Sequence, residues 1–190
     1  MEENVILSAI KGDEKLLWSG KAGKFETLDK VYKPKLIKNA IISLAAAIAV
    51  IVVYVILARK NNADVMSAAI IIIAAVGCLS PASIFTNANK LRKSINYAVT
   101  DKRLIVADDH AKSAEFKTIK EAKFYTDEAG MTSLLCGSRA VKATGGKIRD
   151  LAVGGCHIDE EKNICDCLVF YGIEDAEKLR TILKPYINIE

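Results

Sequence analysis

The stretch INYAVTDKRLIVADD, residues 95–109, alternates apolar and polar side chains on either side of a short polar turn. Because successive side chains of a strand point to opposite faces, this pattern predicts antiparallel strands at 96–99 and 104–107, in a sheet with one exposed face. We expect residues 100–103 to form the turn. The hairpin begins only nine residues after an apolar run long enough to cross a bilayer, so the sequence places a sheet close to a membrane.

Two long apolar segments precede this hairpin. Residues 39–58 hold no charge over twenty positions, and residues 65–89 hold none over twenty-five. A helix of about 20 residues, rising 1.5 Å per residue, spans a hydrocarbon core of about 30 Å. We therefore expect a transmembrane helical hairpin over 39–89, with helices at 39–58 and 65–86 joined by a six-residue turn.

The apolar segments have two other interpretations. Buried helices of a soluble bundle would need polar positions at helical spacing, and residues 40–57 offer only Ser43 and Tyr54. A signal peptide would need a charged leader of 38 residues, which is far longer than the usual n-region. Both alternatives fit less well than a membrane anchor.

Positive charges flank the apolar segments unevenly. Seven lie on the outer flanks, whereas the connecting turn holds two against one aspartate. The positive-inside rule therefore predicts a multi-pass protein of the cytoplasmic membrane with both termini in the cytoplasm. The five cysteines, an odd number, are expected to be free thiols in that reducing compartment. The seven flanking charges are Lys30, Lys33, Lys35, Lys38, Lys90, Arg92 and Lys93.

The remaining sequence predicts an α+β chain with two cytoplasmic parts. Residues 1–38 are a polar N-terminal segment, and 94–190 show short apolar runs separated by turn residues, as in an antiparallel sheet domain. Residues 174–184 repeat apolar positions every three or four, which predicts a closing helix that Pro185 ends. Further strands are expected at 114–119, 122–126, 132–136, 139–143, 147–153 and 165–171.

Three short motifs carry a family resemblance. The first, EKLLWSG at residues 14–20, has the form charged, Leu, Trp, small, Gly. The second, YAVTDKRLI at residues 97–105, opens the expected sheet. The third, FYGIEDA at residues 170–176, leads into the last expected helix. With the hairpin between them, they resemble the bacterial pleckstrin-homology (PH) domain family of membrane proteins over nearly the whole chain, except at 129–158. The resemblance implies a PH-like fold of two roughly orthogonal antiparallel sheets closed by a C-terminal helix. It implies much less about activity.

The residues of the second motif favour architecture over ligand binding. Tyr97 and Val99 point to one face of their strand, where Leu104 and Val106 of the next strand can meet them. Arg103 is expected to pair within the turn or with a terminal carbonyl, and reaching a lipid phosphate is the alternative.

Basic residues next to the bilayer are the candidate binding residues. Each lysine or arginine near an anionic surface contributes about 1 kcal/mol to lipid binding, although a merely solvated surface is the alternative. These lipid- or partner-binding candidates are Lys33, Lys35, Lys38, Lys90, Arg92, Lys93, Arg103, Arg139, Lys142, Lys147 and Arg149.

Cys156, His157, Cys165 and Cys167 are residue types that bind zinc, and a hairpin turn at 159–163 could bring them together. Cys165 and Cys167 would share one face of a strand, whereas the neighbours Cys156 and His157 would point in opposite directions. The four ligands would therefore need a bulge or loop to converge.

Other function classes have little support. The TGGK sequence at 144–147 lacks the first glycine and the Ser or Thr of a phosphate-binding loop. Residues 94–190 carry fourteen basic and sixteen acidic residues, which argues against a nucleic-acid partner. No nucleophile, base and orienting residue form a recognisable set, and no cofactor is implied.

We expect a non-enzymatic binding or scaffolding module at the cytoplasmic membrane face. Its partner would be anionic lipid headgroups, another membrane protein or a second copy of the chain. A zinc-binding or thiol-dependent membrane protein is the alternative function.

Overall fold

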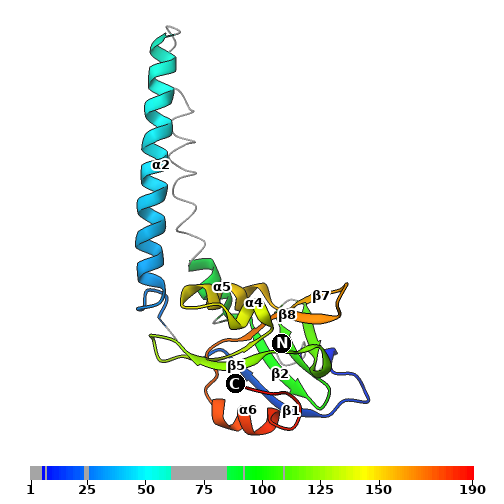
Figure 1. Ribbon diagram of the computed structural model, residues 1–190. Helices are drawn as coiled ribbons and strands as arrows, with labels where there is room; N and C mark the ends of the chain where they lie inside the picture. Colours follow the sequence, from blue (N-terminus) through cyan, green and yellow to red (C-terminus); the bar gives the residue numbers. More distant parts are fainter. Residues whose placement is uncertain (1–5, 7, 24–25, 61–84, 92, 109) are drawn as a thin grey trace.

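The computed structural model describes residues 6, 8–23, 26–60, 85–91, 93–108 and 110–190. One long helix, α2 (Tyr32–Lys60), rises from a unit built of two antiparallel sheets (Figure 1). Residues 85–91 are helical and lead back into that unit. The connecting turn of the expected hairpin, and nearly all of its second helix at 65–86, lie outside the described residues.

Helix α2 contains the first expected membrane segment and extends it at both ends. Its most apolar window of eighteen residues has a mean hydropathy of 3.0, and none of that window is buried against the protein. Asp29 caps the helix, because its Oδ1 atom accepts hydrogen bonds from the backbone of Val31 at 3.0 Å and of Tyr32 at 3.1 Å. Pro34 lies in the first turn, where a missing N–H group costs little.

The first sheet has four antiparallel strands in the order β1–β2–β3–β4. Tyr97 pairs with Val106 and Val99 with Leu104, so the predicted facing of the hairpin is confirmed. The expected exposed face is wrong, because every residue of β2 is buried and Ile6 covers the second face. The strands are β1 (Leu16–Lys21), β2 (Asn96–Thr100), β3 (Arg103–Ala107) and β4 (Ala111–Glu115).

Strand β1 comes from the N-terminal side of α2, although residues 1–38 were expected to be a separate segment. It pairs along β2, with Trp18 opposite Val99. The Trp18 ring lies 6.1 Å from Phe170 of the second sheet, and Phe170 stacks on Tyr97 at 4.6 Å. The sheet unit is therefore assembled from residues on both sides of the apolar region.

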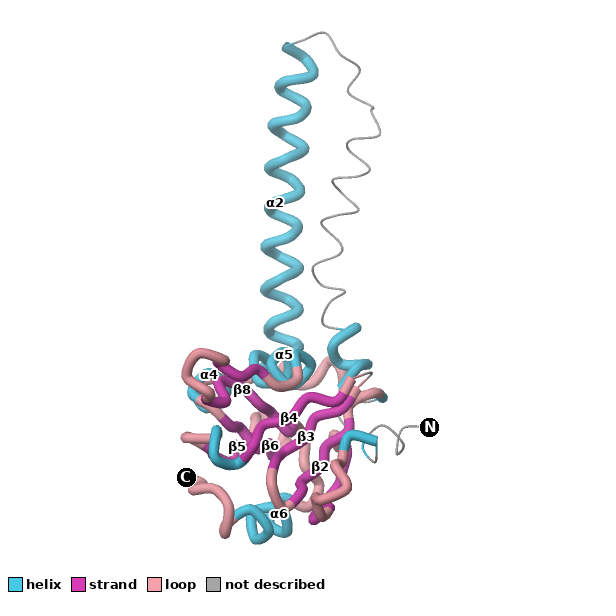
Figure 2. Tube along the Cα trace, turned by 90° about the vertical axis from the view of Figure 1, so that its right-hand side faces the viewer, coloured by secondary structure: helices cyan, strands magenta, loops and turns pink. Residues whose placement is uncertain are grey.

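The second sheet has the order β5–β6–β8–β7. Its strands are β5 (Ala122–Thr126), β6 (Thr132–Cys136), β7 (His157–Asp159) and β8 (Ile164–Phe170). Asp127 organises the turn between β5 and β6 by accepting hydrogen bonds from the backbone of Ala129 and Met131, both at 2.9 Å. The expected helix at 174–184 is present as α6 (Ala176–Leu183), which lies at the opposite end of the unit from α2 (Figure 2).

Two expected strands are helices instead. Residues 139–143 fall on α4 (Ser138–Val141), and residues 147–153 fall on α5 (Gly146–Gly154). Ile148, Arg149 and Ala152 of α5 are all buried, which is helical spacing, because the neighbours Ile148 and Arg149 would point to opposite faces of a strand. The expected strand at 114–119 is also divided, since β4 ends at Glu115 and a 3₁₀ turn, η1 (Phe116–Thr118), follows it.

Candidate functional site at the base of the long helix

Helix α5 lies at the base of α2 and beside the helical residues 85–91 (Figures 1 and 2). The Asp150 carboxylate pairs with Lys35 in the first turns of α2. It also accepts a hydrogen bond from Asn87 Nδ2 at 3.4 Å. One side chain of α5 therefore contacts both chain segments that border the apolar region.

Arg149, the neighbour of Asp150 on α5, is fully buried. Its guanidinium forms two hydrogen bonds to Asp29, one of them from Nη1 at 3.1 Å. Its Nε donates to the Tyr171 hydroxyl at 2.6 Å, and Asp127 Oδ2 lies 3.5 Å from Nη2. A buried guanidinium needs such charged and hydrogen-bonding partners, since it stays protonated.

Aromatic rings enclose the same guanidinium on two sides. Its central carbon lies 4.7 Å from the Tyr32 ring centroid and 5.0 Å from that of Tyr171. The Tyr171 hydroxyl also donates to Asp127 at 2.8 Å, and burial raises the pKa of Tyr171. We call Asp29, Tyr32, Asp127, Arg149 and Tyr171 the buried junction.

The Tyr32 hydroxyl differs from the rest of the buried junction. It is buried, yet it makes no hydrogen bond with any other described residue. The Tyr32 ring packs against Gly146 at the start of α5, where an added Cβ would lie 3.4 Å from the ring. Tyr32 therefore contributes packing against α5 and a cation–π contact with Arg149 rather than a hydrogen bond.

The expectation that Arg149 faces lipid headgroups is wrong, because Arg149 is buried in the junction. Two other candidates, Lys35 and Lys90, form ion pairs with Asp150 and Asp108. Arg92 lies outside the described residues.

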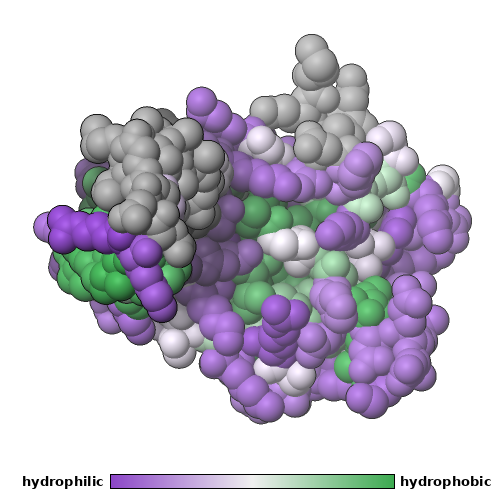
Figure 3. Space-filling view, turned by 90° about the horizontal axis from the view of Figure 1, so that it is seen from above, coloured by the Kyte–Doolittle hydropathy of each residue, from purple (hydrophilic) through white to green (hydrophobic). Residues whose placement is uncertain are grey.

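Six candidates remain exposed and make no ion pair with another described residue. Figure 3 looks onto the end of the molecule from which α2 projects and shows hydrophilic side chains around an apolar centre. We call these six the basic rim. They are Lys33 and Lys38 of α2, Lys93 after the second apolar segment, Arg139 of α4, Lys142 after it, and Lys147 of α5.

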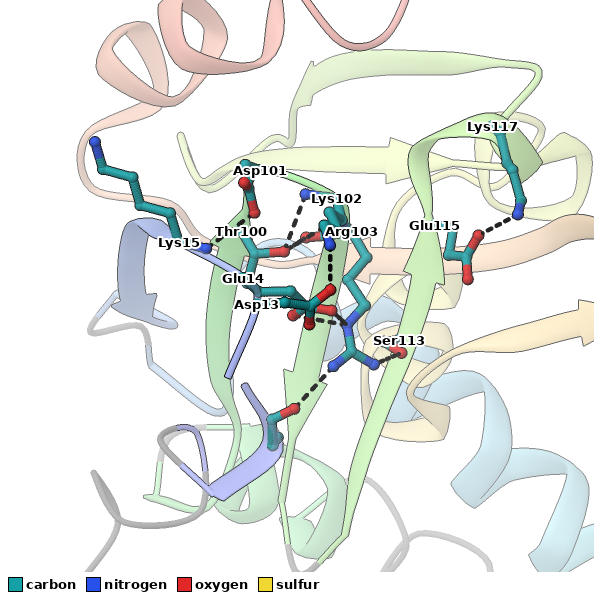
Figure 4. Close-up of polar contacts among 11 residues, drawn as sticks. Asp13, Glu14, Lys15, Thr100, Asp101, Lys102, Arg103, Ser113, Glu115 and Lys117 are labelled. Carbon is teal, nitrogen blue, oxygen red and sulfur yellow. Dashed lines mark hydrogen bonds and ion pairs between the residues drawn. The ribbon is translucent and has the colours of Figure 1, made fainter. Parts of the chain in front are cut away.

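Arg103 lies apart from the basic rim, at the far end of the β2–β3 hairpin (Figure 4). Its Nε donates to Glu14 at 3.1 Å, Nη1 to Ser113 at 2.9 Å and Nη2 to the Ala9 carbonyl at 2.8 Å. Thr100 Oγ1 closes the turn by accepting from the backbone N–H of Arg103 at 3.1 Å. These contacts favour the architectural interpretation, with Glu14 rather than a turn residue as the ionic partner.

The zinc-ligand candidates do not converge. His157 points outward, with its side chain 65% exposed and Nδ1 3.8 Å from Asp166. Cys165 and Cys167 are buried, and Cys156 is partly buried. Among the described residues, no group of three or more histidine, cysteine or acidic side chains is placed to hold a metal ion.

Sequence reasoning did not identify the acidic and aromatic members of the buried junction. In the sequence, Tyr171 stands out only as part of a family motif, at residues 170–176. Asp29 and Arg149 are 120 positions apart, and no local pattern connects them. Their charges looked like ordinary solvated charges because burial depends on the tertiary fold.

Comparisons of the chain with protein-family models, with curated proteins and with solved structures find no match.

Proposed function

We propose that the protein is a membrane-anchored, non-enzymatic binding module. In this proposal the sheet unit is PH-like, sits on the cytoplasmic face of the membrane, and binds anionic headgroups or a membrane partner there. The observation that carries the proposal is the combination of an unburied apolar helix, α2, with a first turn that is fixed into the sheet unit.

The exposure of α2 supports a membrane environment. A core helix of similar composition would be covered by protein, whereas most large apolar side chains along α2 are exposed, including Ile41 at 62% and Leu44 at 63%. Soluble proteins rarely expose a contiguous apolar surface of this extent. A bilayer is the solvent in which this helix would be stable.

The buried junction supports close attachment of the sheet unit to the anchor. Asp29 caps α2 and pairs with Arg149, and Lys35 pairs with Asp150 one residue further along α5. The anchor would therefore hold α4, α5 and the basic rim near the headgroups. Fixing a binding surface there raises the local concentration of any partner at the membrane, which makes weak binding effective.

Two observations support the PH-like part of the proposal. Two four-stranded antiparallel sheets are followed by one C-terminal helix, and Trp18 of the first motif packs against Phe170 of the third. The lysine-rich flanks of α2 and of residues 85–91 support cytoplasmic termini.

Membrane fractionation of the full chain tests the proposal. We expect the chain to stay in the membrane pellet after high-salt and alkaline washes, and the sheet unit to be digested by protease in inverted vesicles only. The matched variant Ile48→Lys with Val52→Lys should lose membrane insertion, because each lysine costs about 3 kcal/mol at the centre of a span. Release of the unaltered chain by salt, or its recovery in the soluble fraction, would overturn the anchor.

A further inference from the structure

Helix α5 lies level with the points where both apolar segments meet the sheet unit. Its Asp150 carboxylate pairs with Lys35, four residues before the uncharged segment 39–58. It also accepts a hydrogen bond at 3.4 Å from Asn87, the residue that follows the second expected span. Four residues of α2 rise about 6 Å, because each residue of an α-helix adds 1.5 Å.

This distance matches the interfacial layer of a bilayer. A membrane about 40–45 Å thick, with a hydrocarbon core of about 30 Å, leaves about 5–8 Å for the headgroup region on each side. With residues 39–58 of α2 in the hydrocarbon, α5 therefore lies in that layer.

The direction of α5 also fits the membrane plane. It runs across the base of α2 rather than along it (Figure 1). A helix that lies in the interface places its polar and basic side chains among the headgroups and its apolar side chains at the acyl boundary. Because α2 would cross the bilayer, a helix that runs across its base would lie in this way.

The two sides of α5 differ in what they contact. Ile148, Arg149 and Ala152 are buried against the sheet unit. Lys147 and Leu151 are one turn apart on the other side, where they neighbour Asp150. Lys147 is exposed and Leu151 is half-buried. Since Asp150 points toward the two segments that border the apolar region, this outward side of α5 faces the same end of the molecule as α2.

The surface around α5 has the composition of a lipid contact. Val141 of α4 is half-buried like Leu151, and both lie at the margin of the main core. Lys142 and Lys147 are exposed beside them. Seen from the end where α2 projects, apolar side chains form a centre that hydrophilic ones surround (Figure 3). Lysine can cover such an apolar surface with its stem while its ammonium reaches a phosphate.

We propose that α5 is an in-plane interfacial helix, in which Leu151 contacts the acyl chains next to the headgroups and Lys147 reaches lipid phosphate. The proposal rests on the membrane anchor proposed above and deepens it, because it adds an apolar lipid contact to headgroup binding. It also connects the lipid to the buried junction. Arg149 and Asp150 are adjacent on α5, so the lipid that holds the outward side of this helix also holds the residue at the centre of the junction.

Tryptophan fluorescence of the full chain in lipid nanodiscs tests the proposal. The chain has one tryptophan, Trp18, which is buried in the sheet unit, so the unaltered chain gives the background signal. Leu151→Trp is compared in nanodiscs of ordinary lipids and of lipids that carry bromine near the glycerol end of their acyl chains. We expect bromine to reduce the added fluorescence about twofold or more, because an interfacial side chain lies at the acyl boundary.

Two further variants control for folding and for position. Lys147→Trp replaces an exposed side chain one turn from Leu151 and should also be quenched, so it decides the proposal if Leu151→Trp does not fold. Glu177→Trp on α6, at the opposite end of the unit from α2 (Figure 2), should not be quenched.

The outcomes separate this proposal from the anchor on which it rests. Unquenched fluorescence of the α5 variants, in a chain that stays in the nanodiscs, would overturn the interfacial helix and leave the anchor standing. Equal quenching of Glu177→Trp would also overturn it, because the signal would then not depend on α5. A chain that does not enter the nanodiscs would overturn the anchor and the interfacial helix together.

Discussion

Arg149 of α5 and Asp29, the cap of α2, form a buried ion pair that joins positions 120 residues apart. The Asp29 side chain is 12% exposed, and that of Arg149 is not exposed at all. The pair fixes the start of the long helix to the sheet unit. Asp127 and Tyr171 also contact the Arg149 guanidinium, so this buried charge has protein partners on several sides.

Arg149→Met should strongly destabilise the sheet unit. The substitution leaves the carboxylates of Asp29 and Asp127 in a largely buried site without their counter-ion, and breaking a buried pair in this way costs about 3–5 kcal/mol. Denaturant unfolding of the detergent-solubilised chain measures the change in the free energy of unfolding. Arg139→Met removes an exposed arginine of α4 and should stay within about 0.5 kcal/mol of the unaltered chain. Equal stability of the two variants would show that the junction is not a buried ion pair.

Two tyrosines of the junction should respond differently to the loss of one hydroxyl. Tyr171→Phe removes a donor to Asp127 and an acceptor for Arg149, and should cost about 1–3 kcal/mol. Tyr32→Phe keeps the ring over the same guanidinium and removes a hydroxyl that bonds to no described residue, so its effect should be below about 0.5 kcal/mol. Thermal unfolding of both variants gives the comparison, and a larger loss for Tyr32→Phe would contradict the described hydrogen bonds.

The sequence predicts those parts of the fold that local patterns determine. The alternation of apolar and polar residues identifies the β2–β3 hairpin and the residues that face each other across it. The recurrence of apolar residues every three or four positions identifies α6. The same reasoning misassigns α4 and α5, because α5 is short and its apolar positions, Ile148 and Ala152, also fit a strand when read in isolation. Burial of Arg149 depends on contacts with distant residues, and no local pattern contains that information.

Alkaline pH should weaken the sheet unit. Burial raises the pKa of Tyr97 and of Tyr171 above that of an exposed tyrosine. The unfolded chain therefore loses these two protons at about pH 10, while the folded chain retains them. Stability from this source is complete below about pH 10 and declines as the pH rises further.

Tyrosinate absorbance followed together with unfolding measures this effect. Some of the six tyrosines should ionise only when the unit unfolds. In Tyr97→Phe the stability should fall less steeply above about pH 10, because one of the retained protons is gone. Ionisation of all six tyrosines in a unit that is still folded would contradict the burial of Tyr97 and Tyr171.

Residues 94–190 alone should not fold, because β1 lies before the apolar region. Without β1, the edge of β2 is left unpaired, Trp18 is missing from the core, and Arg149 has no Asp29. A chimera that joins 1–33 to 86–190 through a flexible linker should unfold cooperatively, which denaturant titration detects. Trp18→Ala in that chimera should cost about 3–5 kcal/mol. A fragment 94–190 as stable as the chimera would make β1 dispensable.

The same chimera, which lacks both apolar segments, can test whether the basic rim meets anionic lipid. Lys142→Gln with Lys147→Gln removes two exposed lysines next to α4 and α5, each worth about 1 kcal/mol near a charged surface, so binding should weaken about 30-fold. Lys178→Gln on α6 with Lys184→Gln at its C-cap makes the same change in net charge at the opposite end of the unit (Figure 1), and should have little effect. Co-sedimentation with vesicles containing phosphatidylserine, at low and at physiological salt, measures both. Equal weakening by the two pairs would mean that net charge alone drives binding, and that the rim is not a lipid-facing surface.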